Sequence, residues 1–383
     1  MKVVFFANYM PDTCGAFFHD VAIAKLLQAR GHIVNFVTTF RGNYPIRGEY
    51  RGIPWVYYTN AENEMRGADI WSSPHFPTLK IVRRLNGRFH KPLIVTMHFG
   101  ENLEELPYQP EWAEFLWVIS NHITNTVRNR IGTDYHFKTL EPIRPIMIEN
   151  EVKFQERGTP PPGKYVTLIN ANVLKGLPLF IEIATRMPNI KFMGVRPYYN
   201  KINVPENIPN IKWIDVQDDI RDVMKQTRIL LVPSLYESWG RVAFEAMYNG
   251  IPVLHTKPMD GSNPANTRPS GSTQGMCEWI GNSQFMLDYN NIQDWITTIR
   301  HLTVESEYQK YSKQAYDTAY GLKIFKDIET IESKMFDYGT RFAPAPTLGN
   351  KTVVQVPTPS LQVRMPLAGG GMPLRGGRFL LRR

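Results

Sequence analysis

Short apolar runs alternate with amphipathic stretches along the first 155 residues of the chain. KVVFFA (2–7) is apolar throughout after its lysine, which is typical of a buried strand. AFFHDVAIAKLLQARG (16–31) repeats apolar residues with helical spacing and ends in glycine, which predicts a helix. Further strands are predicted at HIVNFVTT, WVYYT, DIWSS, PLIVTMH and FLWVIS, with helices at FPTLKIVRRLN and NHITNTVRNRIG. Strands that alternate with helices imply a parallel sheet covered on both faces.

The alternation restarts after QERGTPPPGK (155–164), whose Pro and Gly predict a domain boundary. Strands are then predicted at KYVTLIN, IKFMGV, NIKWIDV, RILLVPS and IPVLHT, and helices at GLPLFIEIATRM, DIRDVMKQT and RVAFEAMYNG. We therefore predict two successive doubly wound α/β domains, residues 1–155 and 164–320, and a helix at 321–340 that packs back on the first domain. Ligands of such sheets bind at the carboxyl ends of the strands, hence in the cleft between the domains.

The last segment, residues 341–383, is rich in Pro, Gly and Arg and is predicted to be extended. Its basic residues are Arg341, Lys351, Arg364, Arg375, Arg378, Arg382 and Arg383, and it holds no Asp or Glu. The tail thus carries +7 of the net charge of +9, which leaves +2 for the first 340 residues. Attraction for a nucleic acid or another polyanion is therefore concentrated in the tail.

Composition excludes several classes of protein. The two cysteines, Cys14 and Cys277, provide neither a disulfide framework nor a zinc site, so we expect a cytoplasmic protein. The first apolar run is too short for a signal peptide, and no run approaches the roughly 20 apolar residues of a membrane span. The adjacent acids Asp218 and Asp219 more plausibly start a helix than hold a metal, so we expect neither metal nor cofactor.

The stretch YESWGRVAFEAMYNG (236–250) holds the candidate chemistry. Glu237 lies in the loop after a predicted strand, and Glu245 lies in the helix that ends before Gly250. The helix N-terminus between the two acids offers backbone N–H groups to a phosphate, and carboxylates bind vicinal hydroxyls well. The arrangement suits a nucleotide sugar, with hydroxyls at both ends and phosphate in the middle. The residues alone fit two ordinary solvated charges equally well.

This stretch resembles the signature of glycosyltransferase family 4, because Glu-x7-Glu follows "VPS" and runs into "EAM..G.PV". The resemblance implies the GT-B fold, two Rossmann-like domains facing a central cleft with C-terminal helices crossing back. It also implies metal-independent, retaining transfer of a hexose from a nucleotide sugar, with UDP-glucose the first guess, to an unknown acceptor. Glu237 then binds hydroxyls of the donor sugar and Glu245 the ribose hydroxyls. The backbone that runs along sugar and phosphates belongs to Ser238, Trp239, Gly240, Arg241 and Val242.

A second block, LINANVLKG, ends where Lys175 and Gly176 open a helix. The resemblance implies that Lys175 contacts the donor diphosphate, while a solvated surface lysine is the alternative. Many family members carry an arginine five residues earlier, where this chain has Asn170. Arg196 and Arg241 are the candidates for the missing positive charge.

Two positions in the first domain complete the predicted site. His98 follows the strand PLIVTM, where the family places a histidine near the donor sugar and the reaction centre; a purely structural histidine is the alternative. Gly15 lies in the first loop, which in the family borders the acceptor and the phosphates. Asn8, Cys14 and His19 lie close by and are predicted either to touch the acceptor or only to shape the loop.

The chain departs from the family pattern in three places. IENEV (148–152) replaces a common "PNGV", the long polar loop at 257–276 is predicted to form a mobile lid, and the basic tail is not a family feature. Two other functions stay open: a glycosyltransferase that modifies DNA bases or another polyanion through the tail, and a non-catalytic sugar-nucleotide-binding or interaction protein on the same fold.

Overall fold

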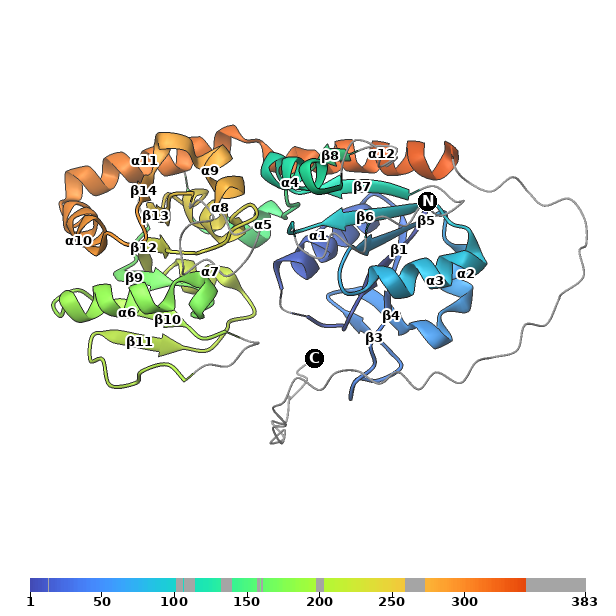
Figure 1. Cartoon of the computed structure of the whole chain (residues 1–383), viewed down its shortest axis with the longest axis horizontal. Coiled ribbons are helices and arrows are strands. Elements are labelled where there is room, and N and C mark those ends of the chain that lie inside the picture. The colour runs from blue at the N-terminus through green and yellow to red at the C-terminus, as the bar shows by residue number, and fades with distance from the viewer. Residues whose placement is uncertain are drawn as a thin grey trace, which may run out of the picture. The chain divides into compact units, whose positions relative to one another are not determined.

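The computed structural model describes residues 1–12, 14–100, 106, 114–131, 140–156, 159, 161–197, 203–258 and 273–341. Most of the predicted lid at 257–276 and nearly all of the basic tail lie outside the described residues. The described chain forms two sheets with helices packed around them (Figure 1). Both sheets belong to one compact unit, Met1–Pro344.

The first sheet has the strand order β3-β4-β2-β1-β5-β6-β7-β8 and is parallel except for the antiparallel pair β3 and β4. Its strands are β1 (Lys2–Ala7), β2 (Ile33–Thr38), β3 (Arg47–Tyr50), β4 (Ile53–Tyr57), β5 (Ile70–Pro74), β6 (Leu93–Met97), β7 (Glu114–Val118) and β8 (Leu140–Pro142). The helices around it are α1 (Gly15–Ala29), α2 (Glu62–Gly67), α3 (Leu79–Phe89) and α4 (Asn121–Ile131). The parallel first sheet predicted from the sequence is confirmed.

Strand β1 shows why this sheet needs cover on both faces. Val3 and Phe5 point into one apolar core, with α1, whereas Val4 and Phe6 point into the other core, with α3. Side chains alternate across a strand, so an uninterrupted apolar run places large side chains on both faces of the sheet. Helices on both sides remove these side chains from water.

The second sheet has the order β11-β10-β9-β12-β13-β14, and all of its strand pairs are parallel. Its strands are β9 (Tyr165–Leu168), β10 (Phe192–Val195), β11 (Ile211–Ile214), β12 (Thr227–Val232), β13 (Val253–Thr256) and β14 (Phe285–Leu287). The helices of this part of the chain are α5 (Glu149–Val152), α6 (Leu177–Arg186), α7 (Ile220–Met224), α8 (Arg241–Met247), α9 (Gln274–Ile280) and α10 (Ile292–His301).

The last two helices connect the second sheet back to the first. Helix α11 (Glu305–Gly321) packs on α8, and α12 (Asp327–Arg341) inserts Ile328 and Met335 into the core of the first sheet. Arg144, which follows β8, donates to both carboxylate oxygens of Asp327, at 2.7 and 2.5 Å. None of the helices in the described part of the chain combines the length and hydropathy that a membrane span requires.

Candidate functional site

The two loops that carry the predicted chemistry lie side by side because their strands are neighbours. Strand β12 pairs with β9 in parallel, so the segments that follow both strands leave the same edge of the sheet. The amide of Leu235 donates to the carbonyl of Leu174 at 2.9 Å and joins the two loops directly. Gly176 has φ +82°, and a Cβ on it would lie 2.0 Å from the carbonyl oxygen of Pro233. Glycine is therefore required where the loops touch.

This loop contact brings Lys175 and Glu237 together. Lys175 Nζ lies 2.5 Å from Glu237 Oε1, and the hydroxyl of Ser234 donates to the same oxygen at 2.8 Å. Glu237 is 7% exposed, whereas the Lys175 side chain is 28% exposed. A nearly buried carboxylate therefore faces an accessible cation at the carboxyl ends of β9 and β12.

Glu245 lies one helical turn into α8 and pairs with the first residue of that helix. Arg241 Nε donates to Glu245 Oε1 at 2.8 Å. Burial raises the pKa of Glu245, and the Arg241 guanidinium partly offsets this rise. Gly240 precedes the helix with φ +77°, and a Cβ there would lie 2.6 Å from the Met276 side chain. This second ion pair is thus positioned by a glycine turn held against α9.

Helix α9 also fixes the backbone that is predicted to follow the donor. Trp279 stacks on Trp239 with ring centroids 5.0 Å apart, and its indole N–H donates to the Trp239 carbonyl at 2.7 Å. A Cβ on Gly275 would lie 1.8 Å from the carbonyl oxygen of Ser238. Val242, one position inside α8, is half-buried. The loop between β12 and α8 is therefore held along its length by packing and hydrogen bonds.

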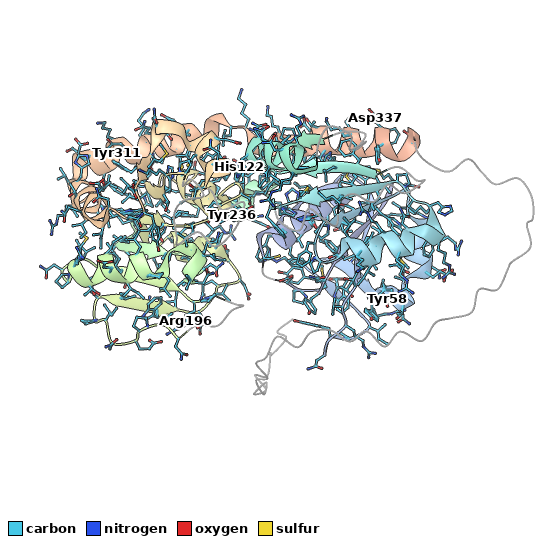
Figure 2. All side chains as sticks on the ribbon, viewed as in Figure 1. Tyr58, His122, Arg196, Tyr236, Tyr311 and Asp337 are labelled. Atoms are coloured by element: carbon cyan, nitrogen blue, oxygen red, sulfur yellow. The ribbon has the colours of Figure 1, made fainter. Side chains whose placement is uncertain are left out.

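The structure separates the two candidates for the missing positive charge. Arg196 pairs with Glu206 at 2.6 Å and with Asp215 at 3.4 Å, and these acids raise its pKa. Figure 2 shows Arg196 well apart from Tyr236, the residue before Glu237. Arg241, in contrast, keeps a buried Nη1 that finds no hydrogen-bond partner among the described residues. Arg241 is therefore the better candidate.

Asn170 stands where many family members have an arginine, and it plays a local role. It has φ +60°, and its side-chain oxygen accepts from the Asn172 amide at 3.0 Å. The Asn172 side chain in turn accepts from the Lys175 backbone N–H at 3.1 Å. Asn170 thus helps to shape the loop that presents Lys175.

On the first sheet, His98 follows β6 and is 9% exposed. Burial and the neighbouring His75 lower the pKa of His98 to about 3, so its ring is neutral near pH 7. Two residues later, the Gly100 N–H donates to the Tyr236 hydroxyl at 3.4 Å. The loop after β6 therefore contacts the loop that carries Glu237, although the hydrogen bonds found among the described residues do not join His98 to Glu237.

The glycine loop before α1 is described except for residue 13. Gly15 begins α1, and a Cβ on it would have open space. Burial raises the pKa of the neighbouring Cys14 thiol to about 12, so this cysteine is an inert thiol rather than a nucleophile. Asn8 accepts hydrogen bonds from Thr39 and Thr78, which is a structural role within the loop.

Within the described ranges, the one cluster with the residue types of a metal site is His19, Asp20 and His98. One nitrogen of each histidine and one oxygen of Asp20 lie within 4.8 Å of one another. However, His19 Nδ1 accepts the Ile146 N–H at 2.9 Å, so a neutral His19 carries its proton on Nε2. A metal-bound histidine instead donates from the nitrogen that does not bind the metal. The residues present therefore do not fit a metal.

Sequence reasoning missed several contributors to this region. Ser234 and Tyr236 lie inside the motif that drew attention to Glu237, but only their contacts reveal their roles. No sequence pattern singles out Asp20 or Trp279 as part of this region. An acid within a helix matches no motif, and neither does a tryptophan some 40 positions from its partner.

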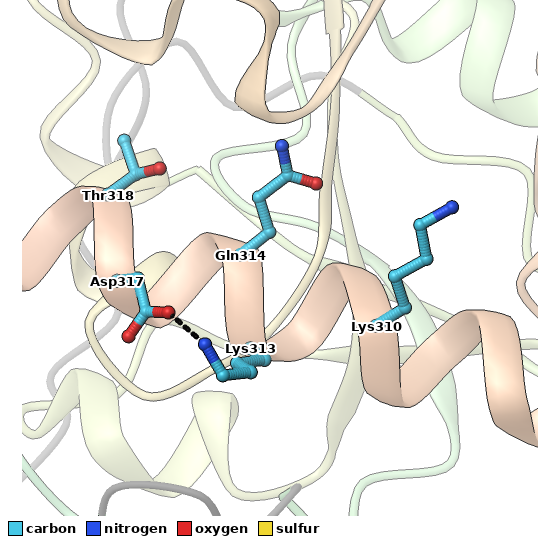
Figure 3. A pocket seen from close by; sticks show the side chains of 5 residues that line it. All are labelled: Lys310, Lys313, Gln314, Asp317 and Thr318. Carbon is cyan, nitrogen blue, oxygen red and sulfur yellow. Dashed lines mark hydrogen bonds and ion pairs between the residues drawn. The ribbon is translucent and has the colours of Figure 1, made fainter.

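Two surface hollows on the described residues lie away from this site. One of about 450 Å³ is lined by side chains of α11 alone, where Lys313 pairs with Asp317 at 2.5 Å (Figure 3). Another, of about 320 Å³, is lined by residues such as Lys164, Lys191 and Arg228 next to the amino ends of β9, β10 and β12. Ligands of parallel sheets bind at the opposite, carboxyl ends, so neither hollow is the candidate site.

Comparison with known proteins relates part of the second domain to a known family. Residues 198–267, which include β12, α8 and β13, match the family "Glycosyl transferases group 1". The uncharacterized glycosyltransferase MJ1178 of Methanocaldococcus jannaschii is 24% identical over 287 residues, 67% of this chain and 79% of that protein. These findings support a glycosyltransferase.

The similarity to solved structures extends over both sheets. HepE of Anabaena in complex with UDP-glucose superimposes with a TM-score of 0.67 at 14% identity, covering 87% of this chain and 100% of that chain. Sucrose-phosphate synthase of Thermosynechococcus elongatus gives a TM-score of 0.65 at 12% identity, covering 88% and 99%. The chain has the GT-B fold. The predicted architecture of two Rossmann-like domains is thereby confirmed.

Proposed function

We propose that this GT-B glycosyltransferase is a retaining enzyme that transfers a hexose from a nucleotide sugar, with UDP-glucose as the first candidate donor. The observation that carries the proposal is the Lys175–Glu237 pair. Glu237 lies with Arg241 and Glu245 in the segment 198–267 matched by the group 1 family, whereas Lys175 precedes that segment. A nucleotide sugar carries hydroxyls, which carboxylates bind, and phosphates, which cations bind. The two pairs supply two groups of each kind. The complex of HepE with UDP-glucose shows such a donor on the same fold.

Glu237 orients the donor sugar in this proposal. Both of its contacts, with Lys175 and with Ser234, are made by Oε1. A sugar hydroxyl is then expected to donate to Oε2. Glu245 binds the ribose hydroxyls at the other end of the donor. Its carboxylate is buried, and Arg241 favours the ionised form that accepts hydrogen bonds well.

Lys175 and Arg241 stabilise the diphosphate as it leaves, so the proposed reaction requires no metal. The carbon–oxygen bond to the diphosphate breaks through an oxocarbenium-like state. The acceptor hydroxyl attacks from the same face, and the leaving phosphate takes its proton. No residue is assigned as a covalent nucleophile or as a general base. The acceptor is unknown, and the polyanion contact through the tail stays a prediction because residues 342–383 are not described.

The first experiment incubates the full chain with a panel of nucleotide sugars and measures nucleotide release. We expect release from at least one of them, UDP-glucose first. Lys175→Ala and Glu237→Ala should each lower the rate at least about 10²-fold, which corresponds to about 2.7 kcal/mol.

Lys313→Ala is the matched control, because Lys313 also pairs with a carboxylate but lies on the outside of α11. It should release nucleotide at the wild-type rate. Near-full activity of either site variant would overturn the residue assignment. Failure of the wild type to bind any nucleotide sugar would instead favour a non-catalytic interaction protein.

A further inference from the structure

The hollow at the amino ends of β9, β10 and β12 takes no part in the proposed mechanism. Its volume is about 320 Å³. Water occupies about 30 Å³ per molecule in the liquid, so the hollow has room for roughly ten non-hydrogen atoms. The candidate donor site lies beyond the opposite, carboxyl ends of β9 and β12, so the hollow is a separate feature of the second domain.

Half of the residues that line the hollow are aliphatic. Strands β9 and β12 and the C-terminal part of α10 supply buried side chains, and the turn before β10 adds a half-buried one. These residues are Val166, Ile229, Ile299, Leu302 and Ile190. All of them belong to, or pack against, the apolar core that contains α6 and α10. An apolar ligand in the hollow would therefore remove aliphatic surface from water.

Three basic residues line the same hollow, and no acidic residue of the described chain does so. Lys164 precedes β9, Lys191 precedes β10, and Arg228 is the second residue of β12. These strands are neighbours in the sheet, in the order β10-β9-β12, so adjacent strands place the cations around one hollow. Like charges at close range repel one another, and a bound anion would replace this repulsion by attraction.

Arg228 is held in place by a buried aromatic ring. Its guanidinium carbon lies 3.8 Å from the centre of the Tyr308 ring, and Tyr308 is fully buried on α11. One nitrogen of the guanidinium donates to Glu305 at 2.7 Å. This bond leaves further N–H donors of the guanidinium for a ligand. With Glu305 included, the surroundings of the hollow still carry a net charge of +2.

Neighbouring helix ends and acids do not account for the two lysines. Helix C-termini attract cations, but α6 and α10 carry basic residues of their own in their last turns, namely Arg186, Arg300 and His301. Within the described residues, neither Lys164 nor Lys191 forms an ion pair. Both side chains are exposed and can move toward a ligand. An anion in the hollow would supply the partner that both lysines lack.

We infer that this hollow binds a small organic anion, which has an apolar body, one anionic head and roughly ten non-hydrogen atoms. The head lies among Lys164, Lys191 and Arg228, and the body lies on the aliphatic part of the lining. Charge excludes the tail of this chain as the occupant, because residues 341–383 hold seven basic residues and no acid. The small volume favours a free molecule over a lipid in a bilayer. The inference does not depend on the proposed function.

The test titrates the full chain with octanoate and with phenyl phosphate, two anions of suitable size that differ in body and in head. Isothermal titration calorimetry measures their affinities. Octan-1-ol lacks the charge of octanoate, octylamine reverses it, and acetate lacks the chain. We expect saturable binding of one octanoate or one phenyl phosphate per chain. Each of the three comparison molecules should bind at least about tenfold more weakly than octanoate.

Variants then locate the bound anion. Lys191→Glu reverses one charge of the lining, and Asn189→Trp fills the hollow from an exposed turn. Each should weaken octanoate binding at least about tenfold. Lys212→Glu is the matched control, because Lys212 is an exposed lysine at the amino end of β11, beside β10, and does not line the hollow. It should change the affinity less than about twofold. The double variant Lys164→Glu with Lys191→Glu should prefer octylamine to octanoate.

Four results would overturn the inference. Octan-1-ol that binds as tightly as octanoate would make the hollow a purely apolar cavity. An anion that UDP displaces would occupy the candidate donor site instead. Vesicles of phosphatidylcholine and phosphatidylglycerol that sediment with the wild type but not with Lys191→Glu, without binding of either free anion, would make this face a membrane contact. A wild type that binds neither anion nor vesicles has no such site. None of these measurements uses nucleotide release, so failure of the proposed function would be seen separately.

Discussion

Replacing Lys175 by methionine separates the structural from the chemical role of the Lys175–Glu237 pair. The change leaves a nearly buried carboxylate whose remaining hydrogen bond comes from the Ser234 hydroxyl at 2.8 Å. Breaking a fully buried pair costs about 3–5 kcal/mol, but the Lys175 side chain is 28% exposed, so water replaces part of the lost contact. We expect a loss of about 1–3 kcal/mol, which lowers the unfolding temperature of a compact unit as long as Met1–Pro344 by about 1–4 °C.

The double variant Lys175→Met with Glu237→Gln supplies the decisive comparison. A neutral amide no longer needs a cation, so the double variant should regain most of the unfolding temperature lost in Lys175→Met. Nucleotide release should stay at least about 10²-fold below wild type in both variants, because the diphosphate has lost its cation. Differential scanning fluorimetry and a UDP-release assay measure the two quantities. The reasoning is refuted if Lys175→Met keeps the wild-type unfolding temperature, or if the double variant regains activity.

Three further predictions concern other parts of the described chain. Gly176→Ala should destabilise by at least about 2 kcal/mol in urea unfolding and abolish nucleotide release, because its Cβ would meet the Pro233 carbonyl at 2.0 Å. Gly15→Ala should keep or slightly raise stability, because a Cβ has open space there, while it raises KM for the donor; an unchanged KM would place the ligand elsewhere. Burial lowers the pKa of His98 to about 3 and that of His255, in β13, to about 4, both below the unfolded value of 6.5. Each histidine therefore lowers the free energy of unfolding by about 1.4 kcal/mol for each pH unit below 6.5, until the pH reaches its folded pKa. His255→Gln should remove one such contribution, so the free energy of unfolding in urea should fall less steeply between pH 6.5 and 4.5. An unchanged slope of this free energy against pH would contradict the assignment.

Long apolar runs made the central strands the easiest elements to predict from the sequence. Strands β1 and β12 lie in the middle of their sheets, so burial on both faces produces the uninterrupted runs that identify them. The sequence analysis missed β3 (Arg47–Tyr50) because RGEY is a mostly exposed edge strand with no apolar run. It also missed α9, which follows a Gly- and Ser-rich stretch and whose packing on Trp239 depends on long-range contacts.

The candidate site, too, could be predicted from the sequence only in part. The motif around Glu237 and Glu245 could be read from the sequence, but the distance between Lys175 and Glu237 follows from the pairing of β9 with β12. That pairing joins strands some 60 residues apart, and no local pattern encodes it. Asp20 was missed for a different reason. A carboxylate between helical residues is usually a solvated charge, and only the packing of α1 shows that this one is buried.

The two ion pairs also indicate which kind of ligand the candidate site can take. Lys175 with Glu237, and Arg241 with Glu245, make two neutral pairs from four charged groups. Each buried carboxylate is stabilised by its cation while no substrate is bound, because an unpaired buried charge is costly. In the proposed complex, a nucleotide sugar brings both partners at once, since its phosphates take up the cations and its hydroxyls donate to the carboxylates. A ligand with phosphates and no hydroxyls would draw the cations away and leave the carboxylates unsatisfied. The arrangement therefore favours a molecule that carries both groups, which supports a nucleotide sugar as the proposed donor.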